Sequence, residues 1–458
     1  EIASLFDINW IIKYPKQYVF PIAKFTSTFV KWLMDEATFG IFTFRDLTRF
    51  IAWLIQQPYN LVLALISKGF LQGQGQDAVE ILSPLSWISV IAIIVSMALY
   101  TKDKILVLLV GFAFFYLVIF GQWASSMVTL SSIIIAVPVG VIIGLSLGIL
   151  SYKSKVLEKI ISPILDLMQT VPVFAYLVPI LVMFGFGPVS ALIATIIYSM
   201  PPMVRTTLLA LKSIDPQIKE CGLMSGCTER QLMWKVLVPV SKPTLMVGVN
   251  QVIMLSLNMV IIASMIGAGG LGYDVLASLR RLNIGAGIET GVAIVVLAIA
   301  LDRLSQAFVN IPSGSKKKNI TFPKKYMKII ALFLFIVSIY VLSSFLPFIK
   351  NFPEHLIINT STFWEGLVKH ININYYDNLE NFKVTLLTYF MLPIKRFFLG
   401  IPWPWFIAII TATGWYFGKL KLGILCFCLS LFIVISGLWE KAMITLYLCG
   451  SSVLIAGI

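Results

Sequence analysis

The chain has 458 residues, of which 59% are hydrophobic and only 12% are charged. Because charged residues make up about a quarter of soluble globular domains, this composition excludes a soluble globule and predicts an all-α, polytopic membrane protein. The formal net charge of +14 would suit a nucleic-acid partner, but the basic residues cluster in loops between apolar segments, so no such partner is expected.

Residues that could carry catalysis or hold a cofactor are sparse. The five cysteines are odd in number, and they are interpreted as small buried residues rather than a disulfide framework. His355 and His370 lack metal-ligand spacing, so no metal site is expected. No phosphate-binding loop of the form G-x-x-x-x-G-K-S/T occurs, so the chain should not bind ATP itself in the usual way. A membrane enzyme is disfavoured because no nucleophile–base pair is found.

Residues 1–85 mix polar and apolar residues and are expected to form an extracytoplasmic, amphipathic N-terminal region. Within it, residues 47–66 carry Arg49 and Gln56-Gln57-Pro58 in an apolar pattern, which predicts a helix lying in the membrane interface. The chain opens at Glu1 without a methionine or a signal peptide, so a preceding piece is expected.

Long apolar runs after residue 85 predict eleven membrane-spanning helices. Seven belong to a first helical domain, residues 86–310, and an eighth follows a basic stretch within residues 311–350, which are interpreted as a cytoplasmic linker plus a connecting helix. The last three lie in the C-terminal region, residues 351–458, behind a second amphipathic segment. The expected spans are 86–100, 104–120, 126–150, 162–185, 188–204, 244–266, 288–309, 328–349, 404–418, 421–437 and 443–458.

Alternating the sides of these helices places most of the net charge on one face. With residues 205–243 inside, the inner loops and helix ends hold 20 Lys and Arg against 7 Asp and Glu, whereas the outer segments hold 15 against 14. The positive-inside rule therefore puts this loop in the cytoplasm and residues 1–85 outside. The run Lys316–Lys318 is interpreted as a topology anchor, with anionic lipid binding as the alternative.

Small and polar residues mark several of the expected helices. Gly140, Gly144 and Gly148 recur at every fourth position, which predicts a face where another helix packs closely. Pro172 and Pro179 interrupt the helix at 162–185, and Met200-Pro201-Pro202 predicts a second break. Such irregular backbone must face protein or a water-filled cavity when it lies at membrane depth.

Six polar residues are expected at or near membrane depth, where they either line a pathway or bond a neighbouring helix. They are Asp166, Gln169, Thr170, Asn250, Gln251 and Asn258. The glycine run at 267–272 lacks a preceding strand, so an external turn is favoured over a dinucleotide-binding loop.

The segment from Glu220 to Pro239 is a polar island between two apolar helices. Its pattern predicts two short helices joined by a turn, with Thr228 as N-cap of the second and Pro239 at its end. Such a helix pair can dock in a groove of a soluble partner through apolar side chains and a few charges. The alternative is an ordinary amphipathic loop of a polytopic protein.

This island resembles the coupling motif of ABC-importer permeases, which reads Glu-Ala-Ala, three residues, Gly, nine residues, then Ile-x-Leu-Pro. Cys221 and Gly222 replace the two alanines, and Val238 replaces the leucine. The resemblance implies a docking site for cytoplasmic ABC ATPase subunits, with polar contacts, a glycine turn and apolar side chains that fill a groove. The candidate coupling residues are Glu220, Cys221, Gly222, Leu223, Met224, Gly226, Arg230, Met233, Val236 and Pro239.

An internal repeat links the two ends of the chain. GQWASSMVTL at 121–130 matches GLWEKAMITL at 437–446 with a constant offset of 316 residues. The flanking hydropathy agrees, and the helix at 328–349 restores the orientation needed for a second copy. We interpret the chain as a fused tandem whose second copy, residues 351–458, stops within its third helix.

The run from Gln122 to Phe308 resembles the permease subunits of glycine betaine/proline-type (quaternary amine) ABC importers. The segments that carry it are LDLMQTVPVFAYLVPI, YSMPPMVRTTLL, the coupling island, NQVIMLSLNMVIIASMIGAGGLG and AIALDRLSQA. The resemblance implies a type I-like helix bundle in the bacterial inner membrane. The partial second copy and its connecting helix depart from the usual single permease of this family, which suggests that one polypeptide does the work of a pair. The resemblance also implies two ATPase subunits that bind ATP and Mg²⁺, and an extracytoplasmic substrate-binding protein.

By the same resemblance, the solute is glycine betaine, proline or a related methylated amine. Aromatic faces attract such cations, so Phe174, Tyr176 and Tyr198, together with Pro172, complete the candidate pathway. The alternative function is a secondary transporter driven by an ion gradient. That class needs ionisable residues in mid-membrane, whereas Asp166 and Asp302 are expected near helix ends.

Overall fold

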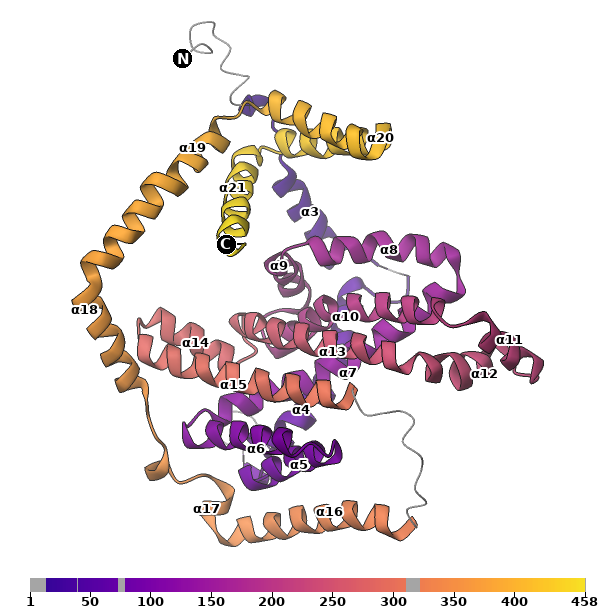
Figure 1. Ribbon diagram of the computed structural model, residues 1–458, viewed down its shortest axis with the longest axis vertical. Coiled ribbons are helices and arrows are strands. Elements are labelled where there is room, and N and C mark those ends of the chain that lie inside the picture. Colours follow the sequence, from indigo (N-terminus) through magenta and orange to yellow (C-terminus); the bar gives the residue numbers. More distant parts are fainter. Residues whose placement is uncertain (1–13, 39, 73–78, 310–321, 458) are drawn as a thin grey trace, which may run out of the picture. The chain divides into compact units, whose positions relative to one another are not determined.

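The computed structural model describes residues 14–38, 40–72, 79–309 and 322–457, and these residues are almost entirely helical (Figure 1). They fall into two compact units. The bundle unit is Arg45–Val368, and the hairpin unit combines Glu1–Phe44 with Lys369–Ile458. The predicted topology anchor, Lys316–Lys318, lies outside the described residues.

The bundle unit begins with helix α4, Phe44–Leu63, which continues into a π-helical turn, η2, Ala64–Lys68. We expected an interfacial helix here, but the segment is long and apolar enough to cross a membrane. Tyr59 is buried against Ala136 of helix α7, Trp123–Lys153, and Leu192 of helix α10, Pro188–Lys212. The helix therefore packs on the bundle. An antiparallel hairpin of strands β1, Phe70–Gln72, and β2, Val79–Leu82, follows.

Helices α5, Trp87–Tyr100, and α6, Lys104–Ile119, form the first helical hairpin (Figure 1). Asp103 caps α6 by accepting from the backbone N–H groups of Ile105 and Leu106, and Lys102 adopts a left-handed conformation at the turn. With 14 and 16 residues, both helices are shorter than the roughly 20 residues of a full span. They share an apolar core with α15, Ile284–Val309.

Three long helices form the centre of the bundle: α7, Trp123–Lys153; α10, Pro188–Lys212; and α13, Val238–Ala263. The glycine stripe of α7 is confirmed as a packing face against α10. A Cβ on Gly144 would lie 2.7 Å from Met203 Cβ, and one on Gly148 would lie 2.5 Å from Thr207 Cβ. Any side chain on these glycines would therefore push the two helices apart.

The predicted spanning helix at 162–185 is instead a pair of helices, α8, Lys155–Thr170, and α9, Val173–Phe184, bent by 105°. The break falls at Pro172 because proline disfavours a helical residue before it. The other predicted interruptions are wrong, since Pro179 lies inside continuous α9, and Pro201 and Pro202 lie inside continuous α10. Among the described residues, six helices can cross a membrane by length and composition, or seven if α8 and α9 count together.

After α13, the glycine run makes the predicted turn and begins α14, Leu271–Arg280. Gly270 has a φ of +76°, and Thr129 of α7 accepts the backbone N–H of Leu271 at 3.0 Å. The short 3₁₀ helix η5, Ser264–Ile266, precedes the run. Later in the unit come α16, Phe322–Phe345, α17, Pro347–Lys350, and the 3₁₀ helix η6, Glu354–Leu356.

The hairpin unit contains the 3₁₀ helix η1, Lys16–Tyr18, α3, Ile22–Asp35, and most of α18, Ser361–Thr385. The π-helical turn η7, Leu386–Met391, and α19, Leu392–Gly400, lead to α20, Trp403–Ile435, and α21, Trp439–Ala456. The backbone of α20 leaves helical geometry at Gly418 and Lys419, and a Cβ on Gly414 would lie 2.8 Å from Cys426 Sγ. The predicted pair of helices at 404–418 and 421–437 is thus confirmed as a second hairpin (Figure 1).

The internal repeat extends to the backbone hydrogen bonds. Gly121 and Gly437 have φ values of +67° and +70°, and helices α7 and α21 begin two residues after them. The N–H groups of Gln122 and Leu438 donate to carbonyls five residues earlier, which is the six-residue loop of a Schellman cap. The repeated sequence therefore gives the same helix end and the same helix start in both copies.

Candidate functional site

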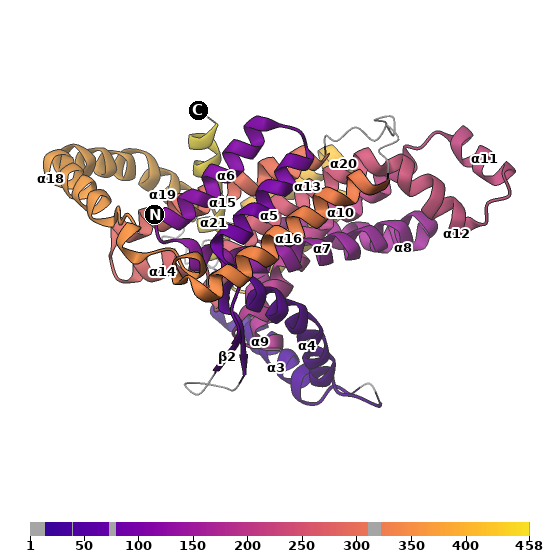
Figure 2. The same ribbon diagram turned by 90° about the horizontal axis from the view of Figure 1, so that it is seen from below.

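The polar island forms a compact helix–turn–helix, here called the coupling loop, Asp215–Pro239. It lies past the ends of α7, α10 and α13 within the bundle unit (Figures 1 and 2). Its first helix, α11, Pro216–Met224, begins after Asp215, whose carboxylate accepts the backbone N–H of Gln217 at 2.9 Å. Proline at the first helical position lacks the N–H that would have no partner there, so the sequence fixes this start.

The turn depends on Gly226, which has a φ of +78°. The N–H of Gly226 donates to the carbonyl of Leu223 at 3.0 Å, and that of Cys227 to the carbonyl of Gly222 at 3.2 Å. Thr228 then caps helix α12, Glu229–Gln231, in a reciprocal box with Gln231. Both ends of the turn are therefore fixed by local hydrogen bonds, as the predicted N-cap requires.

A buried apolar cluster anchors the coupling loop to the bundle. Its members are Leu232, Met233, Leu237, Leu211 of α10 and Ile149 of α7. Gly222 is buried, and a Cβ there would lie 2.6 Å from Leu232 Cδ1, so α11 packs directly on the second helix. Met233, expected on the exposed face, is only 3% exposed. It holds the loop in place because its helix faces the bundle at this position.

The exposed face of the coupling loop carries large apolar side chains among charges. Met224 is 90% exposed and Trp234 is 53% exposed, and Leu223, next to Met224 in sequence, is exposed as well. Glu220, Cys221 and Arg230 are also exposed, whereas Val236 is half-buried. Trp234 is absent from the candidate coupling residues, although an aromatic residue next to Lys235 in an otherwise charged helix pair could have indicated it.

Pro239 does not end the second helix, contrary to expectation. A π-helical turn, η4, Leu232–Leu237, joins α12 to α13 in one continuous span from Glu229 to Ala263. In this turn the N–H of Val238 donates to the carbonyl of Met233, five residues earlier. Pro239, which has no N–H, follows where the helix returns to its normal register. The coupling loop is thereby connected rigidly to a membrane helix.

A pocket of about 430 Å³ lies between α11 and the start of the second helix. Its lining consists of Asp215, Gln217, Ile218, Cys221, Gly222, Ser225, Cys227 and Val236. The coupling loop thus offers a partner both projecting apolar side chains and a recess.

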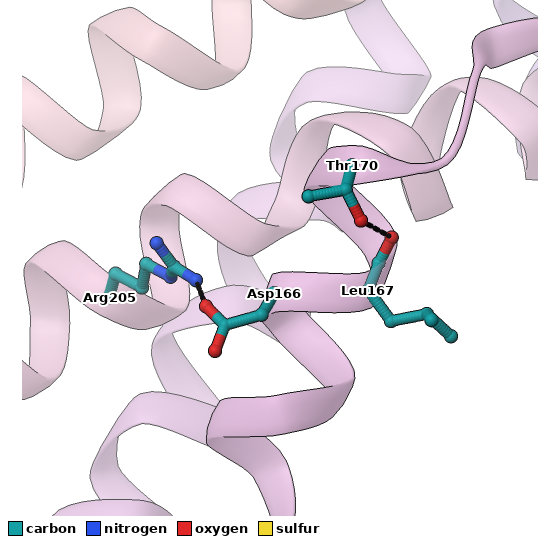
Figure 3. A network of polar contacts seen from close by, with 4 residues as sticks. All are labelled: Asp166, Leu167, Thr170 and Arg205. Atoms are coloured by element: carbon teal, nitrogen blue, oxygen red, sulfur yellow. Dashed lines mark hydrogen bonds and ion pairs between the residues drawn. The ribbon is translucent and has the colours of Figure 1, made fainter. Parts of the chain in front are cut away.

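The candidate pathway residues gather partly around the α8–α9 bend. Asp166 of α8 forms an ion pair with Arg205 of α10, and Thr170 bonds the carbonyl of Leu167 at 3.1 Å (Figure 3). Gln169 is exposed next to them in sequence. The ion pair joins the two helices on either side of α9, but both of its side chains are exposed, so its net contribution to stability is about 1 kcal/mol or less.

Two tyrosines meet just after the bend. Tyr176 of α9 and Tyr198 of α10 lie edge to face, with ring centroids 6.4 Å apart. The hydroxyl of Tyr176 donates to the carbonyl of Met168, in the last turn of α8. Phe174 and Pro172 are exposed. Of the aromatic residues of the predicted pathway, Phe174 and Tyr176 therefore lie on α9, and Tyr198 lies on α10.

The two asparagines of α13 are not part of this group. Asn250 accepts a hydrogen bond from Ser305 of α15, so it serves the packing of two helices. Asn258 is exposed two turns further along α13. Asp166, Gln169 and Thr170 therefore lie at the α8–α9 bend, whereas Asn250 lies in a contact between α13 and α15. Asn258 belongs to neither place.

We predict that Met224 and Met233 respond oppositely to truncation. Met224→Ala should weaken partner binding to the coupling loop and leave the thermal unfolding temperature unchanged, because the side chain is exposed. Met233→Ala should lower the free energy of unfolding by about 2–5 kcal/mol, because it opens a cavity in a buried cluster. Thermal unfolding in detergent and co-purification with an ATPase subunit measure the two effects; equal losses of stability would contradict the assignment.

The chain is similar in sequence to known membrane transport proteins. Residues 136–313 match the model of the family described as "Binding-protein-dependent transport system inner membrane component". The trimethylamine N-oxide transport system permease protein of Pelagibacter ubique is 34% identical over 90% of this chain and 59% of its own length. The glycine betaine transport system permease protein of Bacillus subtilis is 39% identical over 45% of this chain and 72% of its own length.

A third relative, the glycine betaine/proline betaine transport system permease protein of Escherichia coli, is 47% identical over 41% of this chain and 53% of its own length. The chain spans 59% and 66% of the lengths of two trimethylamine N-oxide permeases that it matches. A solved methionine ABC transporter aligns with 22% identity over 40% of this chain and 91% of its own, at a TM-score of 0.37.

Proposed function

Because the chain belongs to the family of binding-protein-dependent transport system inner membrane components, we propose that it is the permease of an ATP-driven importer for a small methylated amine or amine N-oxide. The coupling loop carries this proposal. It presents a capped helix–turn–helix with exposed Met224 and Trp234 at the end of long membrane helices. Such a surface suits docking into a groove of a soluble motor subunit.

In this proposal two ATPase subunits bind ATP and Mg²⁺ and dock on coupling loops, while an extracytoplasmic binding protein delivers the solute. The coupling loop then lies in the cytoplasm and residues 1–85 lie outside. Closure of the ATPase subunits moves the coupling loop, and the continuous helix from Glu229 to Ala263 transmits the movement into the bundle. The buried cluster around Met233 keeps the loop from moving independently.

The proposed solute follows from the relatives and from the aromatic residues at the bend. The related permeases are named for trimethylamine N-oxide and glycine betaine, which share a methylated nitrogen. The faces of Tyr176, Tyr198 and exposed Phe174 can attract such a cationic centre without a buried carboxylate. Asp166, Gln169 and Thr170 then provide polar contacts towards the end of α8.

Replacing Tyr198 tests this pathway. Tyr198→Ala should raise the half-saturating solute concentration for uptake by roughly 2- to 30-fold, since a cation–π contact contributes about 0.5–2 kcal/mol. Tyr198→Phe keeps the ring and should change it by less than about 2-fold. Concentration-dependent uptake into proteoliposomes measures both; equal effects of the two substitutions would exclude a role for the ring face.

Reconstitution tests the proposed function as a whole. The full-length protein, an ATPase subunit and a binding protein in proteoliposomes should accumulate trimethylamine N-oxide or glycine betaine only when ATP is present on the coupling-loop side. A proton or sodium gradient alone should drive no uptake. Accumulation that follows an ion gradient and needs no ATP would overturn the proposal in favour of a secondary transporter.

A further inference from the structure

Two short segments of the chain have the same local structure. The first arm, Tyr14–Phe20, and the second arm, Phe352–Ile358, each begin with an aromatic residue followed by proline. Each then makes one 3₁₀ turn, η1 or η6, which is followed by residues outside any helix or strand. The 3₁₀ turns are closed by equivalent bonds, Tyr18 N–H to Pro15 O at 3.1 Å and Leu356 N–H to Pro353 O at 3.0 Å.

The second arm packs on the first helical hairpin, α5–α6. The ring of Phe352 meets Trp87 edge to face, with centroids 5.6 Å apart and planes at 89°. The N–H of Ile358 donates to the carbonyl of Ile119 at 2.9 Å. Ile357 covers Gly121, where a Cβ would lie 3.0 Å from its Cγ2. The glycine therefore allows the arm to lie directly on the end of α6.

The first arm packs on the second helical hairpin, α20, in the same way. Tyr14 meets Trp403 edge to face, with centroids 5.7 Å apart and planes at 85°. The N–H of Phe20 donates to the carbonyl of Ile435 at 2.9 Å, and a Cβ on Gly437 would lie 2.7 Å from Val19 Cγ1. The three contacts of one arm therefore recur in the other.

The residue numbers show that these two contacts are equivalent. Trp403, Ile435 and Gly437 each follow their counterparts Trp87, Ile119 and Gly121 by 316 residues, which is the offset of the internal repeat. Tyr14, Val19 and Phe20 each precede Phe352, Ile357 and Ile358 by 338 residues. The contact of the first arm with the second hairpin is therefore equivalent, residue by residue, to the contact of the second arm with the first hairpin.

Chain order assigns each arm to a copy. The sequence TSTF follows each arm, at 26–29 and again at 360–363, and a helix contains it or begins next to it in both places. The first arm therefore leads the first copy and the second arm leads the second copy. Each arm nevertheless contacts the hairpin of the other copy, which is why residues 1–44 and 369–458 form one compact unit.

We propose that the two tandem copies pair with each other within one polypeptide by reciprocal exchange of these arms. The partner of each hairpin surface is the arm of the other copy in the same chain. Each contact combines an aromatic pair, worth about 0.5–1.5 kcal/mol beyond its buried area, with a backbone hydrogen bond over a glycine. The exchange makes the two copies one assembly, independent of any ATPase or solute.

Photo-crosslinking tests the exchange in the full-length protein. The photoreactive residue benzoyl-phenylalanine replaces Tyr14 in one variant and Phe352 in another, so both positions keep an aromatic ring. After irradiation, mass spectrometry should find Tyr14 adducts on the peptide that contains Trp403 and Phe352 adducts on the peptide that contains Trp87. The adducts should migrate as single chains on a denaturing gel.

Any other pattern of adducts would contradict the proposal, and each pattern would indicate a different arrangement of the arms. Tyr14 adducts on the Trp87 peptide, with Phe352 adducts on the Trp403 peptide, would mean that each arm folds back on its own copy. Adducts of doubled mass would mean exchange between two chains. The matched control is the same probe at Tyr18, which is 69% exposed in the first arm and should not label the Trp403 peptide. Equal labelling from Tyr18, or no adduct from either arm, would also exclude the exchange.

Discussion

Replacing Gly226 with valine is expected to lower the proposed ATP-driven uptake about tenfold or more while the membrane bundle stays folded. Gly226 has a φ of +78°, which costs L-residues about 1–2 kcal/mol and β-branched residues more. The turn would then shift away from the geometry that joins α11 to α12, since 1.4 kcal/mol changes an equilibrium tenfold. The exposed side chains of Met224, before the turn, and Trp234, after it, would then change their positions relative to each other.

The test separates backbone strain from simple crowding, because a Cβ at Gly226 would meet no atom within 4 Å. Gly226→Asn is the matched control, since asparagine tolerates the left-handed conformation and should keep most of the uptake. Uptake into proteoliposomes and co-purification of the ATPase subunit are measured for both variants, with thermal unfolding as the check on folding. Normal uptake by the valine variant would exclude a role for this turn.

Adding one methyl group to Gly148 is expected to destabilise the bundle. The new Cβ would lie 2.5 Å from Thr207 Cβ and 3.0 Å from the backbone carbonyl of Val204, so α7 and α10 must separate. Overpacking of this kind costs about 1–3 kcal/mol, occasionally more. Gly148→Ala should therefore lower the unfolding temperature in detergent and reduce the amount of folded protein recovered from membranes.

Gly291→Ala provides the control for this effect. Gly291 lies in α15, another long apolar helix, and a Cβ there would meet no atom within 4 Å. The same methyl group should be neutral or stabilising by up to about 1 kcal/mol, because alanine favours helix. If both variants lost stability equally, the loss would come from the helix backbone and not from the α7–α10 contact.

The features of the fold that depend on residues close together in sequence could be predicted from the sequence. Spacing alone predicted the packing stripe of Gly140, Gly144 and Gly148, and the cap by Thr228 followed from residue type and position. The hairpin of α20 was readable because Lys419 and Lys421 interrupt two apolar runs. The repeat at 121–130 and 437–446 was visible because the same turn demands the same glycine.

Tertiary packing decided the features that spacing did not reveal. Pro201 and Pro202 break isolated helices, yet both are buried inside α10, where neighbouring helices hold the backbone. Met233 and Met224 look alike in sequence, and only the position of the bundle shows which one is buried. The contacts of the two arms could not be predicted, because each arm lies hundreds of residues from the hairpin that it contacts. The two arm sequences also share little beyond an aromatic residue followed by proline.

At the bend between α8 and α9, the hydroxyl group of Tyr176 holds the two helices together. A helix that ends inside a bilayer leaves carbonyls without donors, and such groups cannot turn to lipid. The hydroxyl of Tyr176 supplies a donor to the carbonyl of Met168, across the bend. Even in a straight helix this carbonyl would lack a backbone donor, because the residue four positions later is Pro172, which has no N–H. The hydrogen bond from Tyr176 therefore links the two helices across the bend, and any change in the angle between them must first break it.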